Sequence, residues 1–210
     1  MESTANVNDL LGFRNEADVF GKLLDGEEII FSCYVKKKNR IGWVQKRILL
    51  LTNIRLHNVE GKELKRSIEL ASIKALTKNI ENGHTNEFIV HVKDEYDYEL
   101  ITEDRELILK FIMEAHKETK RPEIPIFGVN GKLSHYLTTK KDLKAKQIRG
   151  LPPDMYRLTG TDAVNADSAT WSAHAMPEAK DGAEKKEKPK KEKKVKAPKP
   201  SKGGYVPPPP

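Results

Sequence analysis

The sequence predicts a mainly β domain, a small antiparallel barrel of seven short strands followed by one C-terminal α-helix that caps it. Two patterns indicate this fold. Between residues 27 and 101, short stretches rich in β-branched, aromatic and aliphatic residues are separated by turn residues. Helical periodicity begins after Thr102 and ends before Pro122. The length of 210 residues allows one such domain with appendages.

The strand pattern is clearest where apolar and polar residues alternate, in residues 64–70 and 96–101, as in half-buried strands. The run Ile48–Leu51 has the length of a buried strand. Turn residues such as Gly42, Gly61 and Gly83 lie between the stretches. The seven predicted strands are residues 28–36, 43–52, 55–59, 64–70, 73–76, 87–92 and 96–101.

Three helices are expected around this barrel. A short N-terminal helix within residues 8–24 has Asn15 as its predicted N-cap. The main helix follows Thr102 as N-cap, and a basic helix within 138–150 has Thr139 as N-cap with Asp142 completing a capping box. The apolar face of the main helix is predicted to contain Leu107, Ile108, Phe111, Ile112 and Ala115.

Composition divides the chain into four parts. Residues 1–26 are a helical lead-in, and residues 27–121 are the barrel with its helix. Residues 122–160 are an extension with too few apolar residues for a second core, so it is expected to pack on the barrel or on a partner. Residues 161–210 form a low-complexity tail rich in Lys, Ala and Pro, and this composition predicts disorder.

The positive charge is concentrated in the tail. Between Lys180 and Lys202 there are 11 lysines and four acids, so this segment accounts for the whole net charge of +7. The rest of the chain is neutral on balance, and its cations matter where they are locally concentrated.

The strongest local concentration is the predicted hairpin of residues 35–52, VKKKNRIGWVQKRILLLT. A strand-loop-strand scaffold of this kind can direct several cations at one phosphate-bearing ligand. On the second strand, Arg47 shares a face with Leu49 and Leu51, opposite to Lys46. Arg47 is therefore the best candidate, supported by Lys38 and Arg40 from the loop; the alternative is a solvated hairpin whose lysines only protect a strand edge.

Residues 26–117 resemble the tail homology 1 domain of class I myosins, which has a divergent pleckstrin-homology-like fold. The resemblance rests on residues 36–52, on LKRSIEL and SIKALT within 64–77, on EFIVHV at 87–92 and on DYEL at 97–100. It implies binding of anionic phospholipids, phosphoinositides in particular. In that family a lysine that ends the first strand and an arginine in the second strand hold the headgroup; these positions correspond here to Lys36 and Arg47.

Two features of this chain differ from myosins and from pleckstrin-homology domains, and they limit what the resemblance implies. Pleckstrin-homology headgroup sites often have a further basic residue two positions before the second-strand arginine, where this chain has Gln45. A nucleotide P-loop is missing, since the nearest approach, residues 128–132, has the wrong spacing. The chain is therefore expected to be a stand-alone tail-like module without a motor.

Several other classes of protein are disfavoured. The six histidines are scattered without metal-ligand spacing, no nucleophile, base and orienting group occur together, and Cys33 is expected in the core. We therefore expect no enzyme, no cofactor and no metal site. Neither a signal peptide nor a transmembrane segment is predicted, so the chain is expected to be cytoplasmic.

Two functions remain open. In the first, the barrel is a membrane adaptor that binds an anionic phospholipid or phosphoinositide at a membrane–cytoskeleton boundary, reinforced by the polybasic tail. In the second, the chain is a structural component of a microtubule, ciliary or actin assembly. There the barrel docks a protein, and residues from Lys185 to Lys202 lie on an acidic surface such as tubulin or actin. Nucleic acid is a weaker third partner, because the body has no motif that reads bases.

Overall fold

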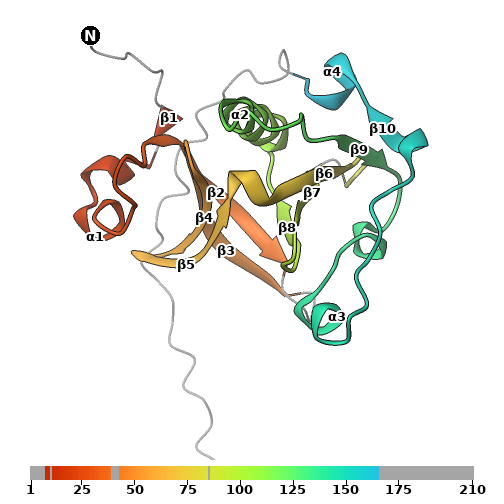
Figure 1. The fold of residues 1–210 in the computed structure, drawn as a ribbon, viewed down its shortest axis with the longest axis horizontal. Helices are drawn as coiled ribbons and strands as arrows, with labels where there is room; N and C mark the ends of the chain where they lie inside the picture. Colours follow the sequence, from red (N-terminus) through yellow and green to blue (C-terminus); the bar gives the residue numbers. More distant parts are fainter. Residues whose placement is uncertain (1–7, 10, 39–42, 85, 166–210) are drawn as a thin grey trace, which may run out of the picture. The chain divides into compact units, whose positions relative to one another are not determined.

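A computed structural model describes residues 8–9, 11–38, 43–84 and 86–165, and the fold is given for these residues. Ten strands form one bent sheet in the order β10-β9-β6-β7-β8-β2-β3-β4-β5, with β1 paired to β2 (Figure 1). The strands are β1 (Asn8–Asp9), β2 (Ile29–Lys38), β3 (Val44–Thr52), β4 (Arg55–Glu60), β5 (Glu63–Glu69), β6 (Ile73–Asn79), β7 (Glu87–Val92), β8 (Tyr98–Ile101), β9 (Ile126–Val129) and β10 (Arg157–Leu158).

The seven predicted strands correspond to β2–β8, which form antiparallel pairs wherever they are neighbours in the sheet. The prediction of a seven-stranded barrel is wrong in number, because the sheet is an open path that also contains β1, β9 and β10. The three missed strands are two to four residues long. Strands this short carry too little alternation to be recognised in a sequence.

Helix α2 (Arg105–Glu118) covers the core at one end of the sheet, toward the top of Figure 1. Leu107, Ile108, Ile112 and Ala115 are buried as predicted, and the ring of Phe111 stacks on Phe31 at 5.0 Å between centroids. The predicted N-cap at Thr102 is wrong by two residues. The cap residue is Asp104, and its backbone N–H donates to Thr102 Oγ1 at 3.2 Å.

Two apolar clusters lie on the two faces of β3, as the alternation predicts. Leu49 and Leu51 join the main core together with Cys33, whereas Leu50 joins a smaller cluster with Phe13 and Val19. Cys33 is buried, and burial raises the pKa of its thiol, which leaves it protonated and unreactive.

The N-terminal segment covers that smaller cluster. The expected single helix is two short turns, η1 (Phe13–Asn15) and α1 (Ala17–Phe20). The predicted cap at Asn15 is wrong, because Asn15 ends η1 and Glu16 precedes α1. A buried network holds the segment in place: Glu27 Oε1 lies 2.6 Å from His57 Nε2 and accepts from Thr52 Oγ1 at 2.7 Å.

The segment after α2 continues the sheet. β9 pairs parallel to β6, with Leu76 opposite Ile126, and β10 pairs with β9. Leu158 of β10 packs so closely on Gly128 that a Cβ there would approach it to 2.8 Å. η3 (Leu133–His135), η4 (Asp154–Tyr156) and α4 (Gly160–Ala163) are short turns along this segment.

Helix α3 (Lys140–Lys144) begins as predicted, because Thr139 and Asp142 form a capping box. It ends at Lys144, well before the predicted stop at Gly150. Of the tail predicted from residue 161, residues 161–165 are described and begin within α4. Residues 166–210 are outside the described residues, and so are the disorder and the surface binding predicted for them. Among the described helices, none is long and apolar enough to cross a bilayer.

Candidate functional site

The pairing register of β2 and β3 decides which cations of the hairpin lie on the same face. Val35 is opposite Arg47, and Lys37 is opposite Gln45, so Lys37 and Arg47 share the face of the buried Val35. Lys36 is opposite Lys46 on the other face, which is exposed. The structure therefore pairs Arg47 with Lys37, and it does not bring Lys36 and Arg47 together.

Four cations from four elements lie near one another; three of them contact two tyrosines, and the fourth, Arg47, lies close enough to Lys37 for its charge to act on that lysine. Lys37 of β2 lies 5.2 Å from the ring centroid of Tyr98. The guanidinium of Arg66, from β5, lies 3.6 Å from the ring of Tyr96 and 5.4 Å from that of Tyr98. Lys140, at the start of α3, lies 4.5 Å from the Tyr96 ring. We call Lys37, Arg47, Arg66 and Lys140 with Tyr96 and Tyr98 the inner cluster.

Electrostatic repulsion within the inner cluster is visible in the pKa of Lys37. Burial lowers this pKa, and the positive charges of Arg47, Arg66 and Lys140 lower it further. Burial likewise raises the pKa of Tyr98, whose hydroxyl stays protonated and able to donate. A positive potential with a buried donor beside it favours an anion.

Two partly exposed acids pair with the inner cluster. Arg47 Nη1 lies 2.5 Å from Glu60 Oε1, and Arg66 Nη2 lies 3.1 Å from Glu95 Oε2. The arginine side chains are 12% and 8% exposed, whereas the acids are 48% and 50% exposed. Because the acids reach in from solvent, they can turn away when a stronger anion arrives.

Several buried donors of the inner cluster have no hydrogen-bond partner among the described residues. They are Arg47 Nε, both Nε and Nη1 of Arg66, and the hydroxyl of Tyr98. An unpaired buried donor costs about 1–3 kcal/mol, so in native structures such a donor is usually satisfied by a protein group, a water or a ligand. Four such donors in one cluster make it the candidate binding site for an acceptor-rich group.

The remaining predicted site residues are placed differently. Lys36 is exposed on the outer face, and Arg40 is outside the described residues. Lys38 Nζ lies 3.3 Å from Glu99 Oε1 and 3.7 Å from Glu87 Oε1. Burial would lower the pKa of Lys38, but the two carboxylates outweigh it and raise that pKa, so its charge is already balanced inside the fold.

Sequence reasoning missed Lys37, Arg66 and Lys140. For Lys37 a signal existed, because Phe31, Cys33 and Val35 alternate and place residue 37 on the apolar face. Arg66 also sits on the apolar face of its strand, two residues before the buried Ile68. No local sequence pattern identifies Lys140, because its position depends on how residues 122–160 fold back onto the sheet.

Two buried histidines have structural partners. The ring of His91 lies 2.8 Å from Thr77 Oγ1 and 3.1 Å from Asp97 Oδ2. The His57–Glu27 pair holds the N-terminal segment in place. Among the described residues, no three His, Cys, Asp or Glu side chains are grouped as metal ligands.

The fold therefore has seven antiparallel strands followed by a helix, with a cluster of cations on the inner face of the sheet. The chain belongs to the family described as unconventional myosin tail, actin- and lipid-binding, whose profile matches residues 6–149. The tail-homology resemblance expected from the sequence is therefore confirmed. Among curated proteins, none has a sequence that matches this chain.

Solved structures show weaker likenesses. The hSac2 domain from human phosphoinositide phosphatase Sac2 has a TM-score of 0.46 and 13% identity, covering 63% of this chain and 94% of its own. The Slm1 PH domain in complex with phosphoserine has a TM-score of 0.37 and 17% identity, covering 44% and 97%. The PH domain of human oxysterol binding protein-related protein 11 has a TM-score of 0.36 and 16% identity, covering 44% and 86%.

Proposed function

We propose that this chain is a non-enzymatic adaptor that binds an anionic phospholipid headgroup, a phosphoinositide in particular, on a membrane surface facing the cytoplasm. The observation that carries the proposal is the inner cluster, with four cations and several buried donors that have no hydrogen-bond partner in the part of the chain that the structure describes. Phosphate groups accept such donors strongly, and arginine can hold them with two parallel hydrogen bonds. Membership of a family described as lipid-binding supports the same function.

The binding residues that we propose are Arg47, Lys37 and Arg66. Arg47 was predicted from the sequence, and its partners follow from the register and the ring contacts. Lys36 remains a predicted contributor through its charge, and so does Arg40, which lies outside the described residues. Lys38 contributes least under this proposal, because Glu99 and Glu87 already balance it.

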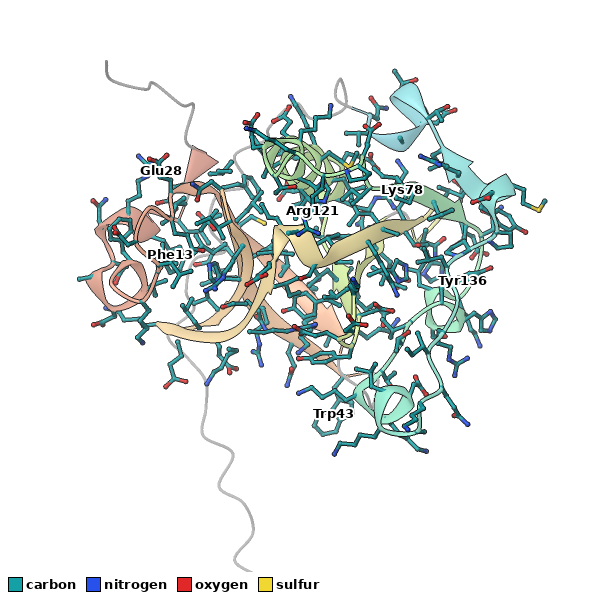
Figure 2. The ribbon with its side chains drawn as sticks, in the orientation of Figure 1. Phe13, Glu28, Trp43, Lys78, Arg121 and Tyr136 are labelled. Atoms are coloured by element: carbon teal, nitrogen blue, oxygen red, sulfur yellow. The ribbon has the colours of Figure 1, made fainter. Side chains whose placement is uncertain are left out.

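Two further features suit a membrane surface. Trp43 is 72% exposed and Val44 is 52% exposed at the end of β3 next to the β2–β3 loop, and Figure 2 shows Trp43 at the edge of the molecule. Tryptophan favours the interface between headgroups and acyl chains. The lysines between Lys185 and Lys202 would each add about 1 kcal/mol near an anionic leaflet.

Vesicle co-sedimentation of the full chain tests this proposal. Binding is expected to rise when phosphatidylserine is replaced by a phosphoinositide at equal total charge. Arg47→Glu should remove that preference, because it reverses a charge inside the cluster, whereas Lys46→Glu on the outer face serves as the matched control. Equal binding to both lipids, or equal effects of the two substitutions, would show that the headgroup site is wrong.

The family description favours a second candidate function, since it also names actin. In this alternative the chain is a structural component of a cytoskeletal assembly, of actin or of a microtubule or cilium, and the tail lies on its acidic surface. Exposed apolar side chains of the extension, Ile148 at 62% and Met155 at 82%, suit protein docking. Co-sedimentation with actin filaments and with microtubules, in the absence of lipid, distinguishes this role.

A further inference from the structure

We propose that the extension after α2 forms one wall of the headgroup site through Lys140. This inference rests on the proposed function and goes beyond it, because it adds a binding residue outside the strands of the barrel.

Lys140 faces the same tyrosine as the strand cation Arg66. Its Nζ lies 4.5 Å from the Tyr96 ring centroid, and the Arg66 guanidinium lies 3.6 Å from it. The charge of Lys140 also contributes to lowering the pKa of Lys37, so the two lysines act on one region of space. Lys140 is exposed, and its ammonium group is therefore accessible to a ligand.

The position of Lys140 is fixed by the residues just before it. The Asp97 backbone N–H donates to Thr138 O at 2.9 Å, and the Thr138 N–H donates to Asp97 Oδ2 at 2.8 Å. Thr139 then caps α3, whose first residue is Lys140. A doubly held backbone followed by a capped helix start fixes the point from which the Lys140 side chain extends over the Tyr96 ring.

The charge of the inner cluster is only partly balanced. Arg66 lies over both tyrosine rings, so it connects Lys37 at Tyr98 with Lys140 at Tyr96. Only two acids, Glu60 and Glu95, ion-pair with the four cations among the described residues. An anion bound there can therefore be held by cations of the strands and by Lys140 of the extension together.

The test compares Lys140→Ala with Lys141→Ala in the full chain. Lys141 is the next residue of the same short helix, is also exposed, and has no ring contact to the inner cluster. On vesicles with a bisphosphorylated phosphoinositide, Lys140→Ala should weaken binding by about 5- to 10-fold and Lys141→Ala by less than about 2-fold. On phosphatidylserine vesicles of equal surface charge, the two variants should be alike.

A second arm uses soluble inositol bisphosphate in calorimetry, which separates headgroup contact from attraction to a charged surface. The proposal requires that Lys140→Ala lose affinity in this arm too. Equal affinities of the two variants in both arms would overturn the extension wall while leaving the proposed function standing. If the unmodified chain shows no preference for the phosphoinositide, the proposed function itself fails. A loss confined to vesicles would mean surface attraction only, and would also overturn the inference.

Discussion

The two faces of the β2–β3 hairpin contain similar numbers of cations but differ in what surrounds them. On the inner face, Lys37 contacts the ring of the buried Tyr98 and shares its face with Arg47, and Arg47 Nε and the Tyr98 hydroxyl have no hydrogen-bond partner among the described residues. On the outer face, Lys36 and Lys46 are exposed to solvent. Solvated lysines attract any anionic surface, whereas buried and partly unpaired donors select a ligand that can satisfy them.

The largest expected loss of binding comes from a substitution in β5, the strand that contributes Arg66 to the inner cluster. Arg66→Met should weaken phosphoinositide binding by about 10-fold or more, because it removes a buried charge and two unpaired donors. Arg55→Met is the control, since Arg55 also has a buried unpaired Nε but makes no contact with the tyrosines. Vesicle binding measures the effect, and thermal melting verifies that both variants fold. If the two variants lose phosphoinositide binding equally, the arginines of the inner cluster are no more important for binding than an arginine outside it.

A smaller effect separates the two faces of β2 directly. Lys37→Ala is expected to weaken binding by about 5-fold, and Lys36→Ala by less than about 2-fold, because only Lys37 contacts the cluster. The same vesicle assay measures both. A larger loss for Lys36 would restore the pair that the family resemblance implies and would contradict the register argument.

Removal of a competing acid should act in the opposite direction. Glu60→Gln leaves Arg47 without its ion pair, so a phosphate no longer has to displace a carboxylate. Binding should strengthen by about 2- to 3-fold. Glu69→Gln, which frees Arg55 instead, is the matched control and should change nothing. Weaker binding of Glu60→Gln would mean that the Glu60 pair organises the site rather than competing for it.

The smallest expected effect is a dependence on alkaline pH. Burial and neighbouring cations lower the pKa of Lys37, and a bound phosphate favours its charged form. As pH rises above 7, Lys37 loses its proton earlier than an ordinary lysine, so affinity should decline before other lysines titrate. Lys37→Arg keeps its charge and should bind evenly across that range. Identical pH profiles of the two proteins would show that Lys37 does not contact the ligand.

Local patterns were sufficient for most of the fold. Alternation identified β2–β8, and the capping residues identified the start of α3, because both depend on neighbours along the chain. Strand pairing between segments far apart in the sequence could not be predicted. The parallel pairing of β9 with β6, for example, joins segments about fifty residues apart. The N-caps at Asn15 and Thr102 were misplaced because a short polar side chain is common near a helix start without capping it.

Prediction of the site residues requires knowing which face of its strand each side chain occupies and how the extension folds. Arg47 was correctly placed on the apolar face of β3, but Lys36 was taken from the family pattern, and a shift of one residue moves a side chain to the other face. Applying the same alternation to Val35 would have selected Lys37. Lys140 could not be found in this way, because the Asp97–Thr138 contacts that place it join residues 41 positions apart.

The most direct test of the inner cluster follows the arginine Nε–H signals by two-dimensional NMR during titration with soluble inositol bisphosphate. Arg47 and Arg66 have Nε groups inside the cluster without a hydrogen-bond partner among residues 8–9, 11–38, 43–84 and 86–165, and Arg55 has such a group outside the cluster. The proposed site predicts saturable shifts of the Arg47 and Arg66 signals with one affinity and no shift of Arg55. Unchanged Arg47 and Arg66 signals in a protein that still binds phosphoinositide vesicles would place the headgroup elsewhere.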